Sequence, residues 1–96
     1  MTSVKEMLLK GAEFLETHKW SRGSLFRDKN KIPCNIDEAC SYCAIGAIIK
    51  SNNTNTNILF NEFGRLSYHD LWKFNDFRAR DKREVVRYIR RLAKQL

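Results

Sequence analysis

The side chains with the most evident chemical potential are basic ones near the C-terminus. The 96 residues include 18 lysines and arginines and 11 aspartates and glutamates, for a formal net charge of +7. Residues 1–76 contain 10 basic and 9 acidic side chains, so residues 77–96 supply +6 of that charge. Such a concentration attracts polyanions, because binding to them releases counterions. We predict an anion-binding surface made of seven residues: Arg78, Arg80, Arg83, Arg87, Arg90, Arg91 and Lys94.

The sequence leaves the partner of this surface open. Arginine predominates in it, and the planar guanidinium forms paired hydrogen bonds with phosphate or carboxylate groups. DNA, RNA and an acidic patch of a host protein would all fit, although many charged helix faces are simply solvated. Tyr88 is the one aromatic residue interleaved with the arginines, which disfavours a stacking platform for single strands. Residues 75–80, between the last two predicted helices, lack the glycine turn of a helix-turn-helix.

Three cysteines could in principle bind zinc, with a histidine as the fourth ligand. They are Cys34, Cys40 and Cys43, and the candidate histidines are His18 and His69. The last two cysteines are expected inside an apolar helix rather than in a zinc knuckle, and no second closely spaced ligand pair exists. We therefore expect core packing, no metal and no cofactor. The odd number of cysteines also argues against a disulfide framework.

A thiol enzyme is a weaker interpretation of the same residues. Cys43 could act as the nucleophile, His69 as the base, and Asn75 or Asp76 as the orienting group. Each has a simpler structural explanation. Cys43 is expected in a core helix, His69 near a helix start, and Asn75 and Asp76 in a turn. The chain also lacks a glycine-rich phosphate loop and the G-x-S-x-G and H-E-x-x-H motifs. We expect a protein without enzymatic activity, and a small zinc-binding or thiol-dependent protein ranks third among the alternatives.

Local signals in the first half predict two helices and a small hairpin. The first helix begins after Ser3, which forms a capping box with Glu6. Its apolar stripe consists of Val4, Met7, Leu8, Phe14 and Leu15. A hairpin or irregular segment is predicted near residues 24–33, where short apolar pairs flank turn-forming residues. Asn35 is expected to cap a fully buried central helix that includes residues 39–49.

The second half predicts a loop and two further helices. Residues 51–57 carry neither charge nor apolar anchors, which indicates a loop, and residues 58–60 return to the core. A helix is predicted to start at the capping box of Ser67 and Asp70 and to end at residues 75–76.

The last helix follows a capping box formed by Asp81 and Glu84. Its apolar arc contains Val85, Val86, Ile89, Leu92, Ala93 and Leu96. The basic arc lies opposite and extends for about 16 Å at a rise of ~1.5 Å per residue. We therefore predict a mainly α fold, a compact bundle of about four helices, forming a single domain over residues 1–96.

Three segments resemble a family of small bacterial and phage proteins whose function is unknown. They are Trp20-Ser21-Arg22-Gly23, Tyr42-Cys43-Ala44-Ile45-Gly46-Ala47-Ile48, and Phe74-Asn75-Asp76 followed by Glu84-Val85. The family pattern is W-x-x-G, W-C-A-x-G-A-I and W-N-D ahead of a helix that begins R/T-x-x-E-V. This chain has Tyr42 and Phe74 where tryptophans are usual, and both changes keep an aromatic side chain. The resemblance implies a bacterial or phage setting and no particular reaction.

The leading hypothesis is a phage-associated or bacterial accessory protein that binds an anionic surface. That surface would belong to nucleic acid or to a host nucleoprotein complex. The alternative is a phage inhibitor of a host protein, of the anti-defence type, that acts by protein–protein docking. No apolar run approaches the ~20 residues of a membrane span, and the N-terminus lacks a signal-peptide pattern. We expect a protein of the bacterial cytoplasm with no membrane association.

Overall fold

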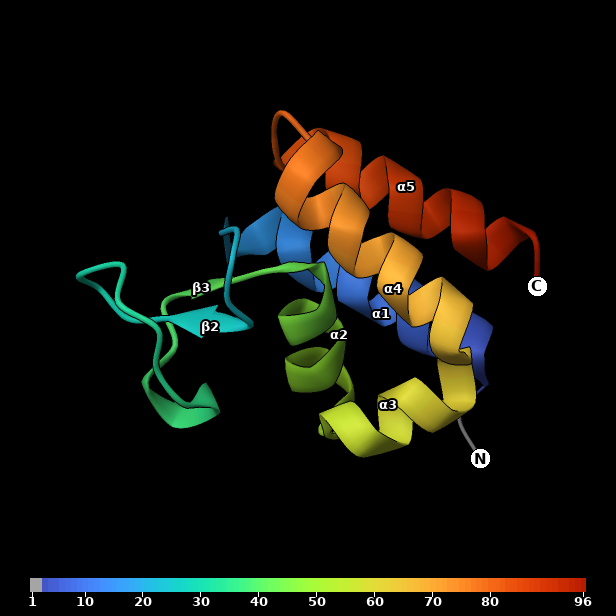
Figure 1. Ribbon diagram of the computed structural model, residues 1–96, viewed down its shortest axis with the longest axis horizontal. Coiled ribbons are helices and arrows are strands. Elements are labelled where there is room, and N and C mark those ends of the chain that lie inside the picture. The colour runs from blue at the N-terminus through green and yellow to red at the C-terminus, as the bar shows by residue number, and fades with distance from the viewer. Residues whose placement is uncertain (1–2) are drawn as a thin grey trace.

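Helices make up most of the chain, and three short strands join the first helix to the second (Figure 1). The computed structural model describes residues 3–96, apart from the side chains of Arg65 and Leu66. The elements in chain order are α1 (Val4–Thr17), β1 (Lys19–Trp20), β2 (Phe26–Arg27), the 3₁₀ turn η1 (Ile36–Glu38), β3 (Ser41–Tyr42), α2 (Ala44–Asn52), α3 (Thr56–Phe63), α4 (Arg65–Lys73), the π-helical turn η2 (Phe74–Arg78) and α5 (Lys82–Lys94). The prediction of a mainly α fold is confirmed, although five α-helices form within residues 3–96 rather than about four.

The core lies where α1, α2 and α5 meet. Residues 44–49 of α2 are all buried, which confirms the prediction of a buried central helix. Gly11 of α1 allows close approach, because a Cβ there would collide with the Ile48 side chain of α2. None of the helices described here combines the length and the apolar character that a membrane crossing requires.

The predicted first helix is confirmed in start and orientation. The Ser3 hydroxyl accepts a hydrogen bond from the Glu6 backbone N–H at 3.1 Å, as an N-cap should. Met7, Leu8 and Leu15 are buried, while Val4 and Phe14 pack partly buried against the core.

The predicted helix over residues 39–49 starts too early. It begins at Ala44, and Asn35 caps only the short turn η1. Residues 41–42 instead form β3, the middle strand of a three-stranded sheet in the order β1-β3-β2. β3 runs parallel to β1 and antiparallel to β2. Pairing on both sides satisfies the backbone N–H and C=O groups of β3, so tertiary contacts override the local helical pattern.

The predicted hairpin near residues 24–33 forms in part. Arg27 and Pro33 make an isolated antiparallel bridge, and the Asp28 carboxylate accepts from the backbone N–H groups of Asn30 and Ile32 at 2.8 and 3.1 Å. The main partner of β2 is β3 rather than the strand-like segment after the turn. The sheet and this turn project from one end of the helices (Figure 1).

The predicted loop over residues 51–57 is shorter than expected. α2 continues to Asn52 and α3 begins at Thr56. Asn53 ends α2 in a left-handed conformation, and the Asn55 side chain caps α3 by accepting from the Ile58 N–H. Residues 58–60 also differ from the prediction, because only Leu59 is buried.

The helix predicted from Ser67 to residues 75–76 has different ends. It starts at Arg65, after Gly64, and no side chain caps it. The chain then continues through the π-helical turn η2, so Asn75 and Asp76 lie inside a helical turn rather than at a helix end. π-Helical turns occur often at functional sites.

Candidate anion-binding surface

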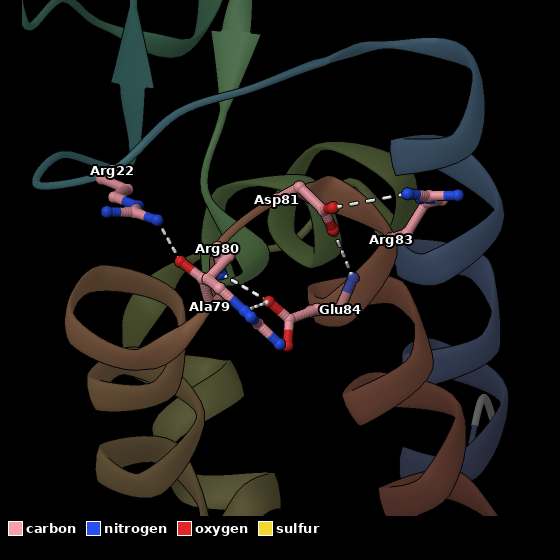
Figure 2. A network of polar contacts seen from close by, with 6 residues as sticks. All are labelled: Arg22, Ala79, Arg80, Asp81, Arg83 and Glu84. Carbon is pink, nitrogen blue, oxygen red and sulfur yellow. Dashed lines mark hydrogen bonds and ion pairs between the residues drawn. The ribbon is translucent and has the colours of Figure 1, made fainter.

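The predicted N-terminus of α5 is confirmed, with one difference in detail. The Asp81 carboxylate accepts from the Glu84 backbone N–H at 3.0 Å. The Glu84 carboxylate reaches back to the N–H of Arg80, at 2.7 Å, rather than to that of the cap residue (Figure 2). The hydrogen bond from the Glu84 N–H, with help from the nearby Arg83 guanidinium, lowers the pKa of Asp81. The cap carboxylate is therefore charged at neutral pH and favours the positive end of the helix dipole.

The two faces of α5 differ as predicted. Val85, Val86, Ile89 and Ala93 are buried, and α5 packs along α1. Leu96 is an exception, because the helix ends at Lys94 and its side chain is 68% exposed.

All seven predicted basic residues are exposed. Five lie on α5 at helical spacing, and these five define what we call the α5 ridge: Arg83, Arg87, Arg90, Arg91 and Lys94. Arg78 ends η2 and Arg80 lies in the link to α5, so both flank the start of the ridge. The structure thus brings the predicted residues to one end and one face of the last helix.

Three of these residues form ion pairs. Arg80 contacts Glu84 at 3.3 Å, Arg83 contacts Asp81 at 3.7 Å, and Arg90 contacts Glu16 of α1. Exposed pairs of this kind contribute only about 0–1 kcal/mol, so a stronger anion can displace the carboxylates. The other four predicted residues form no ion pair within residues 3–96: Arg78, Arg87, Arg91 and Lys94.

A shallow groove of about 440 Å³ runs between α1 and the first half of α5. Arg83, Arg87 and Arg90 line it together with Glu16. Lys82 also lines it, but its ammonium group donates to the carbonyl oxygens of His18 and Glu16 at 3.0 and 3.5 Å. Lys82 therefore satisfies the last carbonyl groups of α1 and fastens the two helices together.

The expected packing in the core is confirmed for one of the three cysteines, Cys43. Cys43 is the N-cap of α2 and is buried, Cys40 is exposed beside β3, and Cys34 is half-buried. The prediction that the last two lie inside a helix is therefore wrong, for the reason given for β3. Within the described chain, no three His, Cys, Asp or Glu side chains gather in a way that could hold a metal ion.

The residues of the thiol interpretation do come close to one another. Cys43, His69 and Asp76 line one cavity of about 410 Å³. Burial raises the pKa of the Cys43 thiol to about 11, so this group is protonated at neutral pH. Its Sγ accepts from the Gly46 N–H at 3.3 Å, and the Asp76 carboxylate accepts from the Gly23 N–H at 3.0 Å. These contacts assign structural roles to both residues, and a protonated thiol is a poor nucleophile.

Thiol labelling should separate Cys40 from Cys43. With a disulfide reagent at pH 8, we expect Cys40 to react first and Cys43 to react only after the protein unfolds. At a pKa of about 11, roughly 0.1% of the Cys43 thiol is ionised at that pH, and the group is also shielded from reagent. Cys40→Ser should remove the fast phase, and a fast phase that survives in Cys40→Ser but disappears in Cys43→Ala would contradict this assignment.

The sequence interpretation missed a second group of basic residues. Residues 19–31 contain five basic side chains and one acidic one, Asp28. The near-neutral balance over residues 1–76 conceals this local excess, which a shorter counting window would have revealed. In the structure, all five line one cavity beside the sheet: Lys19, Arg22, Arg27, Lys29 and Lys31.

The three segments that carry the resemblance meet around one side chain. The Asn75 Oδ1 atom accepts from the Trp20 indole N–H at 2.7 Å and from the Ala44 backbone N–H at 2.9 Å. Residues 1–95 match DUF6197, described as a family of unknown function. The chain belongs to DUF6197. No curated protein and no solved structure matches it. Membership in DUF6197 therefore assigns no activity, and the functional argument depends on the surfaces of this chain.

Proposed function

We propose that this DUF6197 protein is a non-enzymatic accessory protein of a bacterium or phage. It binds an anionic surface, nucleic acid or a host nucleoprotein complex, through the α5 ridge with Arg78 and Arg80. The observation that carries the proposal is the exposure of Arg87 and Arg91 without ion pairs within residues 3–96. These cations are available to phosphate groups without first losing a protein partner.

The geometry of α5 favours a polyanion over a single small anion. The ridge is linear, with successive guanidinium groups one helical turn apart, so it presents several separate contacts along about 16 Å. Backbone phosphates of a nucleic acid also repeat along a line, and such contacts give affinity without sequence preference. The buried apolar face fixes the orientation of the ridge, because turning it inward would expose Val85 and Ile89.

Charge reversal on α5 tests the proposal. We expect Arg87→Glu combined with Arg91→Glu to weaken binding to duplex DNA or RNA by a factor of about ten or more at 0.1 M salt. Fluorescence anisotropy with a labelled oligonucleotide measures the change. Lys10→Glu combined with Lys50→Glu is the matched control, because both lysines are exposed and lie on α1 and α2 rather than on α5. No binding of the unmodified protein to duplex, single strand or RNA at low salt would refute the nucleic-acid form of the proposal.

Salt dependence gives a second measurement of the same contacts. With four or five phosphate contacts, the logarithm of the association constant should fall against the logarithm of salt with a slope of about −4. The double α5 variant should reduce the magnitude of the slope by about 2, since each lost contact contributes about one unit. A slope near zero would mean that phosphates do not dominate the interaction.

A second candidate, docking on a host protein as its inhibitor, is favoured by exposed aromatic side chains close to Arg78. Phe77 is 74% exposed, and its ring meets that of Trp72 edge to face at 6.0 Å. Arg78 follows directly, and aromatic residues with arginine are the types enriched at protein–protein interfaces. A nuclease-resistant complex with a host protein that is lost in Trp72→Ala/Phe77→Ala, but not in the α5 double variant, would support this candidate over the first.

A further inference from the structure

The cavity beside the sheet has the size of a small-molecule site. Its volume is about 530 Å³, within the range of roughly 300–1,000 Å³ typical of ligand pockets. It is bounded by β1, by residues of β2 and β3, and by the turn that follows β2. Its lining comes from three strands and a turn, whereas the groove beside the α5 ridge lies between two helices.

The electrostatics of this cavity are strongly one-sided. Lys19, Arg22, Arg27, Lys29 and Lys31 line it, and Asp28 is its one acidic lining residue, which leaves a formal local charge of +4. Within residues 3–96, none of the five cations forms an ion pair. Five like charges with a single counter-charge among them repel one another, and a bound anion relieves that repulsion.

Two of the cations are fixed by backbone contacts rather than by carboxylates. The Arg27 guanidinium donates to the Arg22 carbonyl at 3.0 and 2.9 Å and to the Lys31 carbonyl at 2.8 Å, so it ties the two sides of the cavity together. The Arg22 guanidinium lies 5.1 Å from the centre of the Trp20 ring and donates to the Ala79 carbonyl just before α5 (Figure 2). Both charges are thereby held in place before any ligand arrives, which lowers the entropic cost of binding.

One residue that lines the cavity also has a buried polar atom without a partner. Ser21 lines it, and the Ser21 hydroxyl oxygen is buried without a partner in the part of the chain that the structure describes. Native proteins leave few buried polar groups unpaired, so this exception in the wall of the cavity calls for a structural or functional explanation.

We propose that this cavity binds a small phosphorylated ligand through its phosphate groups. A concave site with +4 of formal charge suits a compact, multiply charged anion, and lysine and arginine are the usual phosphate-binding side chains. The site is distinct from the α5 ridge and does not depend on the function proposed for that ridge. Phosphates of a nucleic acid are the other possible source of the same chemistry, and the experiment separates the two.

Calorimetric titration with inorganic pyrophosphate and with ADP tests this proposal. We expect at least one of the two probes to bind the unmodified protein at low salt. Lys19→Glu combined with Lys29→Glu should weaken that binding at least tenfold, because it removes the net positive charge of the cavity. Both lysines are exposed, so the variant should fold, which its circular dichroism and melting temperature would verify.

Two control variants separate an effect on the cavity from an effect of net charge alone. Lys10→Glu/Lys50→Glu and Arg87→Glu/Arg91→Glu change the net charge equally but do not touch the cavity, so both should keep the probe affinity within about twofold. An equal loss of affinity in all three variants, or no binding of either probe at 10 mM, would overturn the proposal.

Binding of an oligonucleotide that depends on Lys19 and Lys29, without probe binding, would assign the cavity to nucleic acid and likewise overturn the proposal. Probe binding that persists when the oligonucleotide does not bind would uphold the cavity site while refuting the nucleic-acid role of α5.

Discussion

Replacing Asn75 with alanine is expected to lower the free energy of unfolding by about 3–5 kcal/mol. The Asn75 side chain is 1% exposed and forms four hydrogen bonds. Alanine would leave the Trp20 indole N–H and the Ala44 backbone N–H without acceptors, and each buried unpaired donor costs about 1–3 kcal/mol. The lost side chain would also leave a cavity between η2 and α2.

Chemical denaturation measures this effect, and a melting temperature lowered by about 15–25 °C should accompany it. Asn61→Ala is the matched control, because Asn61 is exposed on α3, and its substitution should change stability by less than about 0.5 kcal/mol. A loss of under 1 kcal/mol in Asn75→Ala would show that the three segments do not depend on this side chain.

The isosteric change Asn75→Asp tests the role of the Asn75 side chain through the pH dependence of stability. It keeps the oxygen that accepts from Trp20 and Ala44 but replaces the amide that donates to Asp76 at 2.8 Å with a second carboxylate. Two adjacent carboxylates repel when both are ionised. The variant should therefore be least stable, relative to the unmodified protein, near pH 7 and should recover part of that difference as the pH falls toward 4.

Replacing Gly46 with alanine is expected to lower the free energy of unfolding by about 2–3 kcal/mol. In an exposed helix this substitution stabilises by up to about 1 kcal/mol. At this site a Cβ would collide with the Leu25 carbonyl oxygen and lie 3.3 Å from the Phe26 ring. That carbonyl accepts from the Cys43 N–H one residue beyond the paired strands, so neither partner can move without disturbing the pairing of β2 with β3.

Urea denaturation of Gly46→Ala beside Lys50→Ala isolates the packing effect. Lys50 is exposed on the same helix, and its truncation should change stability by less than about 0.5 kcal/mol. A gain in stability for Gly46→Ala would contradict the close packing of the β2 segment on α2. Because β2 also forms one side of the sheet cavity, the same variant should weaken pyrophosphate binding if that ligand is bound.

The buried network links the two basic surfaces. Asn75 donates to the Ser21 carbonyl at 3.3 Å, and Arg22 donates to the Ala79 carbonyl ahead of α5. The segment that carries Ser21 and Arg22 is therefore held to η2 through Asn75 and to the link before α5 through Ala79. Figure 2 shows the second of these contacts. A change in this network would displace the sheet cavity and the first residues of the α5 ridge together.

The ends and faces of α1 and α5 could be predicted because they depend on residues three or four positions apart. Ser3 caps with Glu6, and Asp81 caps with Glu84, within one helical turn. The buried and exposed faces follow from the 3.6-residue period alone. The exposure of the arginines on α5 could be predicted for the same reason.

Tertiary structure alone decided the features that depend on distant partners. Residues 41–42 have a sequence compatible with a helix, but two strands more than ten residues away pair with them. Asn75 and Asp76 are typical helix-ending residues, yet side-chain contacts with residues 20–23 hold them within a π-helical turn. The ion pair between Arg90 and Glu16 likewise joins residues that sequence spacing could not connect.

The sequence by itself determined a basic amphipathic last helix and most of the helical content, since short-range hydrogen bonds and periodic burial are encoded locally. Only the tertiary structure decided which cations face a carboxylate and which gather in a cavity. Residues 19–31 form β1, β2 and the turns around them, and their five basic side chains converge because the sheet folds those turns toward one another. Coulomb interactions depend on distance in space, which the order of residues along the chain does not fix.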